Sequence, residues 1–189
     1  MMIRKNKRLI VKSLLAMTIL SLTISLSSFT LIKTGERQRI FTLTQSMKVK
    51  VTAETKGMDI EKIIDYSLKL TASQLQFSRY NDIKHNKANC VGYARLCASI
   101  CNQALATNGI HGYAKPVVGY IESNGINLCN VLKAAAPKNS YKNFVKDHDF
   151  VELVTDSKTY YFDPSIYDVL GKKCLSITNL KNSNNGNII

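Results

Sequence analysis

Cys90, His148 and Asp163 are the residues of this chain whose types could perform thiol-dependent acyl transfer. Such chemistry needs a sulfur nucleophile, a histidine that exchanges protons with it, and a carboxylate that orients the imidazole ring. Each residue alone has an ordinary explanation, as a buried thiol, a surface imidazole and part of an Asp-Pro turn. A site is favoured because the cysteine comes at the start of a predicted helix, the histidine at the start of a predicted strand and the aspartate at the end of the next strand.

The first of these elements is a helix over residues 89–109. Asn89 is a typical N-cap residue, Gly109 is typical after a helix C-terminus, and small apolar residues lie between them at helical spacing. Cys90 would stand in the first turn, where the partial positive charge of a helix favours a thiolate. Its backbone N–H has no partner within the helix and is a natural donor to a developing oxyanion.

The second element is a β-hairpin that begins at His148, with alternating side chains on the two faces. Its turn falls at Asp156 and Ser157. With two residues in the turn, Asp163 lies opposite Phe150. Asp163 is then diagonal to His148 on the same face, where a carboxylate can reach an imidazole. A three-residue loop would move Asp163 to the other face, so the predicted triad depends on this turn.

The other histidines and cysteines are weaker candidates. We expect His85 and His111 to be surface or loop residues, and Cys97 and Cys101 to be small core residues. Five cysteines are an odd number, so at least one has no intramolecular disulfide partner. Because the spacing of zinc ligands is absent, we predict neither a metal nor a cofactor.

Three sequence segments resemble the transglutaminase-like superfamily of papain-type cysteine enzymes. "NCVGYARLCASICNQALATNGIHGYAKPVVGYI" is similar to the nucleophile helix of that family and the extended segment after it. "DHDFVELV" is similar to its His strand and "KTYYFDPS" to its Asp strand. The resemblance covers residues 86–165 and implies that Cys90 is the nucleophile, His148 the general base and acid, and Asp163 the orienting acid.

The resemblance also implies an α+β fold of transglutaminase-like or papain-like type. The nucleophile helix would pack on a small, mostly antiparallel sheet of about three to five strands, in agreement with the order of helices before strands. One position departs from the family, where a Trp commonly follows the His by two residues. This chain has Phe150 there and no Trp at all, so any contribution of a Trp to the oxyanion or to an acyl tunnel is missing or replaced.

The N-terminal residues 1–32 are predicted to be a signal peptide or a single transmembrane signal anchor, in the form of a hydrophobic helix. Five basic residues precede Ser13–Ile32, a run of twenty residues without a charge. A helix needs about 20 residues to cross a bilayer. Basic flanks stay on the cytoplasmic side, so the domain is expected outside, either membrane-anchored or secreted.

The rest of the chain divides into a linker at 33–57, a transglutaminase-like domain at 58–180 and a flexible tail at 181–189. Within the linker, alternation at Met47, Val49 and Val51 predicts one edge strand. The domain opens with a helix whose apolar residues run from Ile60 to Leu75, with Asp59 at its start. Pro116 predicts an edge position or a bulge, and a short helix is predicted at Ile126–Ala136.

Composition limits the classes of function. The 189 residues are 45% hydrophobic and 21% charged, which suits one globular domain with an appendage. The formal net charge is +13, but the basic residues form no nucleic-acid-binding motif, so no nucleic-acid partner is predicted. A chain this basic is expected to be attracted to anionic surfaces in general.

The sequence therefore predicts an exported cysteine enzyme that acts on amide or peptide carbonyls as a peptidase, an amidase or a transglutaminase. Hydrolysis and amine transfer share the first half-reaction, and the sequence does not choose between them. Protein, peptide or cell-wall amides are expected substrates, by compartment only. The alternatives are a catalytically inactive domain that acts as a cell-surface binding module, and a disulfide-stapled structural module in which Cys90 is paired.

Overall fold

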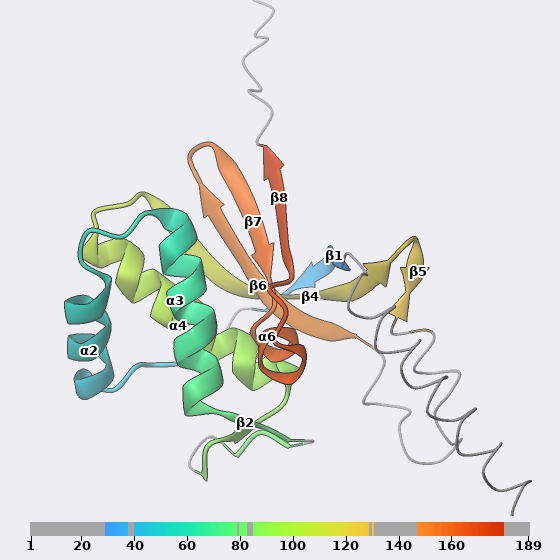
Figure 1. Cartoon of the computed structure of the whole chain (residues 1–189), viewed down its shortest axis with the longest axis horizontal. Helices are drawn as coiled ribbons and strands as arrows, with labels where there is room; N and C mark the ends of the chain where they lie inside the picture. Colours follow the sequence, from blue (N-terminus) through green and yellow to red (C-terminus); the bar gives the residue numbers. More distant parts are fainter. Residues whose placement is uncertain are drawn as a thin grey trace, which may run out of the picture.

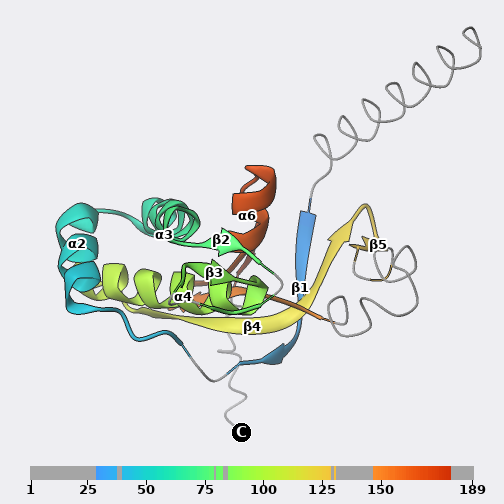
Figure 2. The same ribbon diagram turned by 90° about the horizontal axis from the view of Figure 1, so that it is seen from below.

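The computed structural model describes residues 29–37, 40–78, 80–82, 85–128, 130 and 147–179. Their elements, in chain order, are β1 (Phe29–Glu36), α2 (Gln45–Thr55), α3 (Ile60–Gln74), β2 (Gln76–Phe77), β3 (Lys87–Ala88), α4 (Cys90–Thr107), β4 (Gly112–Ser123), β5 (Ile126–Asn127), β6 (His148–Thr155), β7 (Lys158–Phe162), α6 (Pro164–Leu170) and β8 (Leu175–Asn179). In Figure 1 the helices gather on one side of a curled sheet. Figure 2 shows α4 directly against β4, with α2 and α3 outside it.

The main sheet has six strands in the order β1-β4-β6-β7-β8, with β5 paired to β4, and every pair in it is antiparallel. Strands β2 and β3 form a separate parallel pair. The α+β class and the mostly antiparallel sheet are confirmed. The predicted strand number was too low, because β1 and β5 lie in segments that the sequence assigned to the N-terminal appendage and to a helix.

The central helix α4 begins and ends where the sequence predicted. The side chain of Asn89 accepts a hydrogen bond from the Val91 N–H, and Gly109 follows the helix with a φ of 61°. Cys97 and Cys101 are fully buried against α3, as expected of core residues. Burial raises the pKa of the Cys101 thiol to about 12, so this thiol remains protonated.

The hairpin has the predicted register. Leu153 pairs with Tyr160 and Val151 with Phe162, which leaves Asp156 and Ser157 as the two-residue turn. Asp163 follows β7 directly and is the N-cap of α6. The hairpin therefore has the two-residue turn on which the predicted triad depended, the turn that puts Asp163 on the same face as His148.

The segment 33–57 differs from the linker that the sequence predicted. It contains the end of β1 and the whole of α2, whose residue Val51 is fully buried in the core. The predicted edge strand around Met47 and Val49 is wrong, because these residues belong to α2, which Thr44 caps. Met47 and Val51 are four residues apart, so both can face the core from a helix, whereas Val49 is exposed.

The N-terminal hydrophobic helix falls largely on residues 1–28, which lie outside the described residues. The last four residues of the uncharged run, Phe29–Ile32, are part of strand β1 and pair with β4. In the described part of the chain, no helix has the length and apolar character to cross a membrane. The predicted tail at 181–189 also lies outside the described residues.

Pro116 was expected at an edge position or a bulge, but it is in the interior strand β4, and the register shift between β1 and β4 lies opposite Val118 and Gly119. Its carbonyl accepts a hydrogen bond from the Arg37 N–H at 3.2 Å, and pairing of β1 with β4 ends one residue earlier, at Glu36 and Val117. A hydrogen-bonded antiparallel pair exchanges two bonds, and proline can supply only the acceptor. Pro116 is tolerated here because β1 stops at this point.

The predicted helix at Ile126–Ala136 is wrong at its start. Ile126–Asn127 form strand β5, which pairs back onto the end of β4. The turn between them contains Asn124 and Gly125, both with positive φ, which is typical of a tight β-hairpin. Most of the remaining predicted helix lies outside the described residues.

Candidate active site

His148 and Asp163 are joined directly across the open end of the hairpin. Nε2 of His148 and Oδ2 of Asp163 form a hydrogen-bonded ion pair. The other carboxylate oxygen accepts from the Ser165 N–H at 2.9 Å, the Ser165 hydroxyl at 2.8 Å and the Ile166 N–H at 3.1 Å. One oxygen of Asp163 therefore caps α6, while the other fixes the imidazole.

The two groups hold opposite charges in a largely buried place. Burial by itself lowers the pKa of His148, but the charge of Asp163 and the hydrogen bond to it raise that pKa well above its ordinary value of 6.5. Burial by itself raises the pKa of Asp163, but His148 and the α6 donors bring it below its ordinary value of 3.8. The folded protein thus favours an imidazolium beside a carboxylate.

Cys90 is the first residue of α4 and lies beside His148. It is partly exposed, whereas Cys97, Cys101 and Cys174 are buried, and all four are free thiols. The charge of Cys90 and a hydrogen bond to it contribute to the raised pKa of His148, after the larger effects of burial and Asp163. Because Nε2 is bonded to Asp163, Nδ1 is the ring nitrogen left to exchange a proton with this sulfur.

The first turn of α4 keeps the backbone N–H of Cys90 open next to the sulfur. The Val91 N–H is occupied by the Asn89 side chain at 3.1 Å, and the Asn89 N–H is occupied by the Asn81 side chain at 3.0 Å. Within the described residues, no acceptor is bonded to the Cys90 N–H. This is the donor that the sequence predicted for a developing oxyanion.

Gly92 allows the loop before α4 to lie against this first turn. A Cβ atom at Gly92 would stand 2.6 Å from the Cβ of Ala88 and 2.7 Å from Oδ1 of Asn81. Asn81 was not among the predicted residues, because nothing in its local sequence indicates a contact with a helix start eight residues later.

Phe150 occupies the position where the resembling family commonly has a Trp. It is fully buried, its ring centroid lies 6.5 Å from that of His148, and the two ring planes are inclined by 27°. On its other side, it meets the ring of Tyr161 edge-on at 6.1 Å. Phe150 therefore supports the imidazole from within the core and offers no polar group to the site.

Arg37 is a charged neighbour of the site that the sequence did not predict. Its Nε and Nη2 atoms donate to the two oxygens of Asp149 at 3.0 and 3.1 Å, and Nη2 lies 3.4 Å from Asp147. These two acids stand on either side of His148 in the sequence. Arg37 was missed because it lies in the segment interpreted as a linker, and only the tertiary fold brings it here.

The remaining histidines do not join the site. His85 and His111 are exposed, as predicted, and His85 pairs with Asp82 at 2.8 Å. Across the described ranges, no group of three or more His, Cys, Asp or Glu residues is arranged to hold a metal ion.

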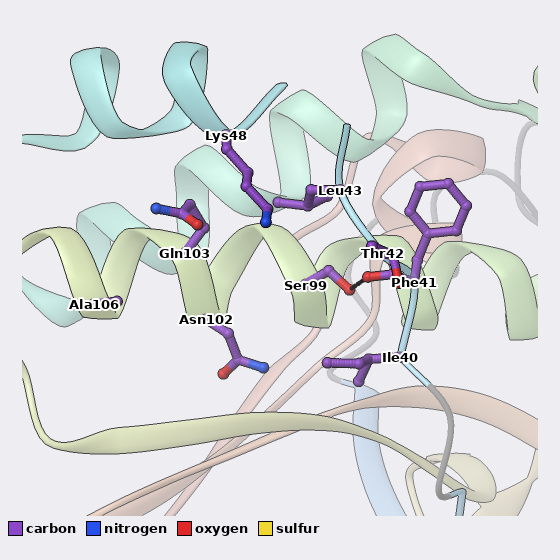
Figure 3. Close-up of a pocket in the computed structure, with 9 residues that line it drawn as sticks. All are labelled: Ile40, Phe41, Thr42, Leu43, Lys48, Ser99, Asn102, Gln103 and Ala106. Carbon is purple, nitrogen blue, oxygen red and sulfur yellow. Dashed lines mark hydrogen bonds between the residues drawn. The ribbon is translucent and has the colours of Figure 1, made fainter. Parts of the chain in front are cut away.

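A cavity of about 310 Å³ lies away from these residues, between the segment 40–43, α2 and the middle of α4 (Figure 3). Two of its polar side chains are already engaged: the Asn102 amide bonds both backbone groups of Ala114, and the Ser99 hydroxyl lies within hydrogen-bond distance of the carbonyls of Phe41 and Arg95. The cavity starts more than two helical turns after Cys90 and includes no member of the predicted triad.

In this arrangement the imidazole of His148 lies between the thiol of Cys90 and the carboxylate of Asp163, and the backbone N–H of Cys90 has no acceptor within the described residues. It can in principle perform nucleophilic acyl chemistry. Comparison with known proteins gives no match to this chain, whether to a family model, a curated protein or a solved structure.

Proposed function

We propose that this protein is an exported cysteine-dependent acyl-transfer enzyme with a transglutaminase-like or papain-like fold. The observation that carries the proposal is the pairing of His148 with the buried Asp163 immediately beside Cys90, at the N-terminus of a helix. A buried ion pair that serves only stability is commonly replaceable by apolar residues. Here, the pair orients a titratable ring towards the only partly exposed thiol among the described cysteines.

The proposed reaction proceeds from a Cys90 thiolate beside the imidazolium form of His148, in which Nδ1 holds the proton that the thiol has given up. The thiolate attacks the carbonyl carbon of an amide, a C–S bond forms, and the Cys90 N–H donates to the oxyanion. The C–N bond then breaks as the imidazolium gives its proton to the leaving amine, which leaves a thioester on Cys90. Asp163 keeps the ring in one orientation and stabilises its charged form.

In the second half-reaction, water or an amine attacks the thioester and gives its proton to His148. The C–S bond breaks, and the thiol is restored with release of an acid or of a new amide. Peptidase, amidase and transglutaminase activity all remain within the proposal. Protein, peptide or cell-wall amides are the proposed substrates, and the domain would be membrane-anchored outside the cell or secreted.

Selective alkylation tests the proposal directly. The full chain in detergent is treated with iodoacetamide at neutral pH, and the modified cysteines are identified by peptide mapping. We expect rapid modification of Cys90, its loss in His148→Ala and its retention in the matched control His85→Ala. The buried Cys97, Cys101 and Cys174 serve as internal references.

A second candidate is a catalytically inactive domain that binds a partner at the cell surface. The buried Phe150, in place of a polar aromatic residue, favours it. Slow and uniform labelling of all cysteines, unaffected by His148→Ala, would favour this candidate and overturn the enzyme. Recovery of Cys90 in a disulfide under non-reducing conditions would overturn both and indicate a structural module.

A further inference from the structure

Two ion pairs connect the β1 segment to β6, although β4 lies between these strands. Lys33 donates to both carboxylate oxygens of Glu152 at 2.9 and 2.8 Å. Arg37 donates to both oxygens of Asp149 at 3.0 and 3.1 Å. The side chains of these acids are 5% and 1% exposed, so both need a counter-ion. Alternation along β6 puts the acids on opposite faces of the strand, with Glu152 on the face of His148. The Arg37 pair adjoins the site in another way: it holds the residues next to His148 in the chain, and the charge of Cys90 acts on Arg37.

The Arg37 contact is a rigid one. Two parallel N–H···O bonds to one carboxylate fix the plane of the guanidinium as well as its distance. The Arg37 backbone is held too, because its N–H donates to the carbonyl of Pro116. A third bond reaches Asp147, so Arg37 holds both sequence neighbours of His148. The start of β6 is thereby tied to the end of β1.

β1 also contacts Gly119, the residue of β4 that pairs with His148. Gly119 pairs with His148, and a Cβ atom there would stand 1.9 Å from the carbonyl oxygen of Ile32 and 3.0 Å from the ring of Phe150. The backbone of β1 therefore lies against the residue that pairs with the histidine. This contact is independent of the Arg37 ion pair, and it too places β1 against the part of the sheet that holds His148.

We propose that Arg37 is a positioning residue, which sets His148 towards Cys90 by clamping Asp147 and Asp149 on either side of it. This inference rests on the proposed function, and it makes strand β1 part of the machinery of the site. The electrostatics agree with the geometry. The pKa of Arg37 is raised above its ordinary value, chiefly by its hydrogen bonds to Asp149, and the charges of Asp149, Asp147 and Cys90 add to this effect.

A purely structural role must be separated from a positioning role, because loss of Arg37 leaves a buried carboxylate unpaired and destabilises the fold. We therefore compare Arg37→Met with Arg37→Met/Asp149→Asn, which removes the unpaired charge. The control is Lys33→Met, which removes the other ion pair between the β1 segment and β6 and leaves Glu152 with Lys115 at 3.4 Å and the Tyr161 hydroxyl at 3.0 Å. The readouts are the rate of Cys90 alkylation as a function of pH, the melting temperature, and an NMR titration of the His148 ring.

We expect Arg37→Met to slow alkylation by about ten- to a hundredfold, the scale of a small misplacement of a catalytic group. The double variant should regain the melting temperature without regaining the rate. Lys33→Met should lower the melting temperature and keep the rate. In the double variant, the pKa of His148 should fall towards 6.5, since the ring leaves its partners, whereas in Lys33→Met it should stay raised.

Recovery of rate and melting temperature together in the double variant would overturn the inference, as would equal slowing by Lys33→Met. If Cys90 of the unaltered protein proves unreactive, the proposed function fails by that result alone. The titration then decides the positioning role separately, because an unchanged His148 titration in the double variant contradicts it whatever Cys90 does.

Discussion

His148 and Asp163 are fifteen residues apart in the chain and share one hydrogen-bonded ion pair across the end of a hairpin. The same carboxylate is the N-cap of α6, so the position of the imidazole is coupled to the start of that helix. A single side chain thus joins a local structural task to a proposed catalytic one. Substitutions that separate these two tasks give the sharpest tests of the site.

Asp163→Asn should keep the fold and abolish most of the reactivity of Cys90. Asparagine caps helices about as well as aspartate. Its amide, however, can donate to Nε2, which leaves the proton on Nδ1, where the base must be empty. Loss of the orienting carboxylate in such triads costs on the order of 10⁴-fold in rate. Alkylation kinetics measure the reactivity of Cys90, and urea denaturation measures the stability of the fold.

Asp163→Ala is the companion variant. It removes the cap as well as the orienting group, so it should lose about 1–2 kcal/mol of unfolding free energy that Asp163→Asn retains. An alkylation rate in Asp163→Asn close to that of the unaltered protein would contradict the proposed role of the carboxylate.

The stability that the His148–Asp163 pair contributes should depend on pH with a defined sign. The pKa of His148 is raised in the folded state, so its contribution is fully present below 6.5 and is lost as pH rises through the folded pKa. The pKa of Asp163 is lowered, so its contribution is present above 3.8 and is lost as pH falls through the folded pKa. The pair stabilises most between these limits.

Urea denaturation at a series of pH values checks this expectation. The difference in unfolding free energy between the unaltered protein and Asp163→Asn should be largest at about pH 4–6.5 and should shrink on both sides of that range. A difference that is constant from pH 4 to pH 9 would show that the two groups do not titrate as a pair.

Local signals were sufficient to predict the elements that carry the site. Asn89 as a cap fixes where α4 begins and therefore where Cys90 stands. The two-residue turn fixes the parity of the hairpin and so brings Asp163 to His148. In each case, the deciding chemistry lies within a few residues of the element that it determines.

The features that the sequence did not predict depend on contacts between distant segments. The helical state of Met47 and Val49 is favoured by burial of the neighbouring Val51 in the core, which overrides a short alternation typical of a strand. Arg37 reaches the site only because β1 pairs with β4 and ends beside Pro116. No local pattern contains this information.

Gly119→Ala should destabilise the protein and displace β1. The added methyl group would meet the backbone carbonyl of Ile32 at 1.9 Å, and a backbone atom cannot rotate away. We expect a loss of about 3 kcal/mol, at the upper end for overpacking. Gly35→Ala is the control in the neighbouring strand, where the nearest atom is a side-chain methyl of Val118 at 2.9 Å that can move.

Hydrogen exchange locates the effect of Gly119→Ala. Protection of the β1 amides should fall in this variant and remain in Gly35→Ala. Equal stability of the two variants would mean that β1 does not lie against the residue opposite His148.

Gly92→Ala should lower both stability and Cys90 reactivity, although a glycine in a helix is normally improved by alanine by about 1 kcal/mol. The new Cβ would stand 2.6 Å from the Cβ of Ala88, which has no side-chain freedom to yield. The loop must then move away from the first turn, and the Asn89 N–H would lose its bond to Asn81. We expect a loss of about 1–3 kcal/mol.

A double-mutant cycle with Ala88→Gly isolates this contact. Ala88→Gly alone should destabilise the protein, because it removes a buried methyl group. Combined with Gly92→Ala, it removes one of the two atoms that the new methyl group would meet, and Oδ1 of Asn81 at 2.7 Å remains. The double variant should therefore be more stable than the sum of the single losses predicts, without regaining the full stability of the unaltered protein. Simple additivity would show that the loop does not pack on the first turn of α4. Alkylation of Cys90 in the same four proteins then reports whether the loop also shapes the site, since its rate should recover together with the coupling energy.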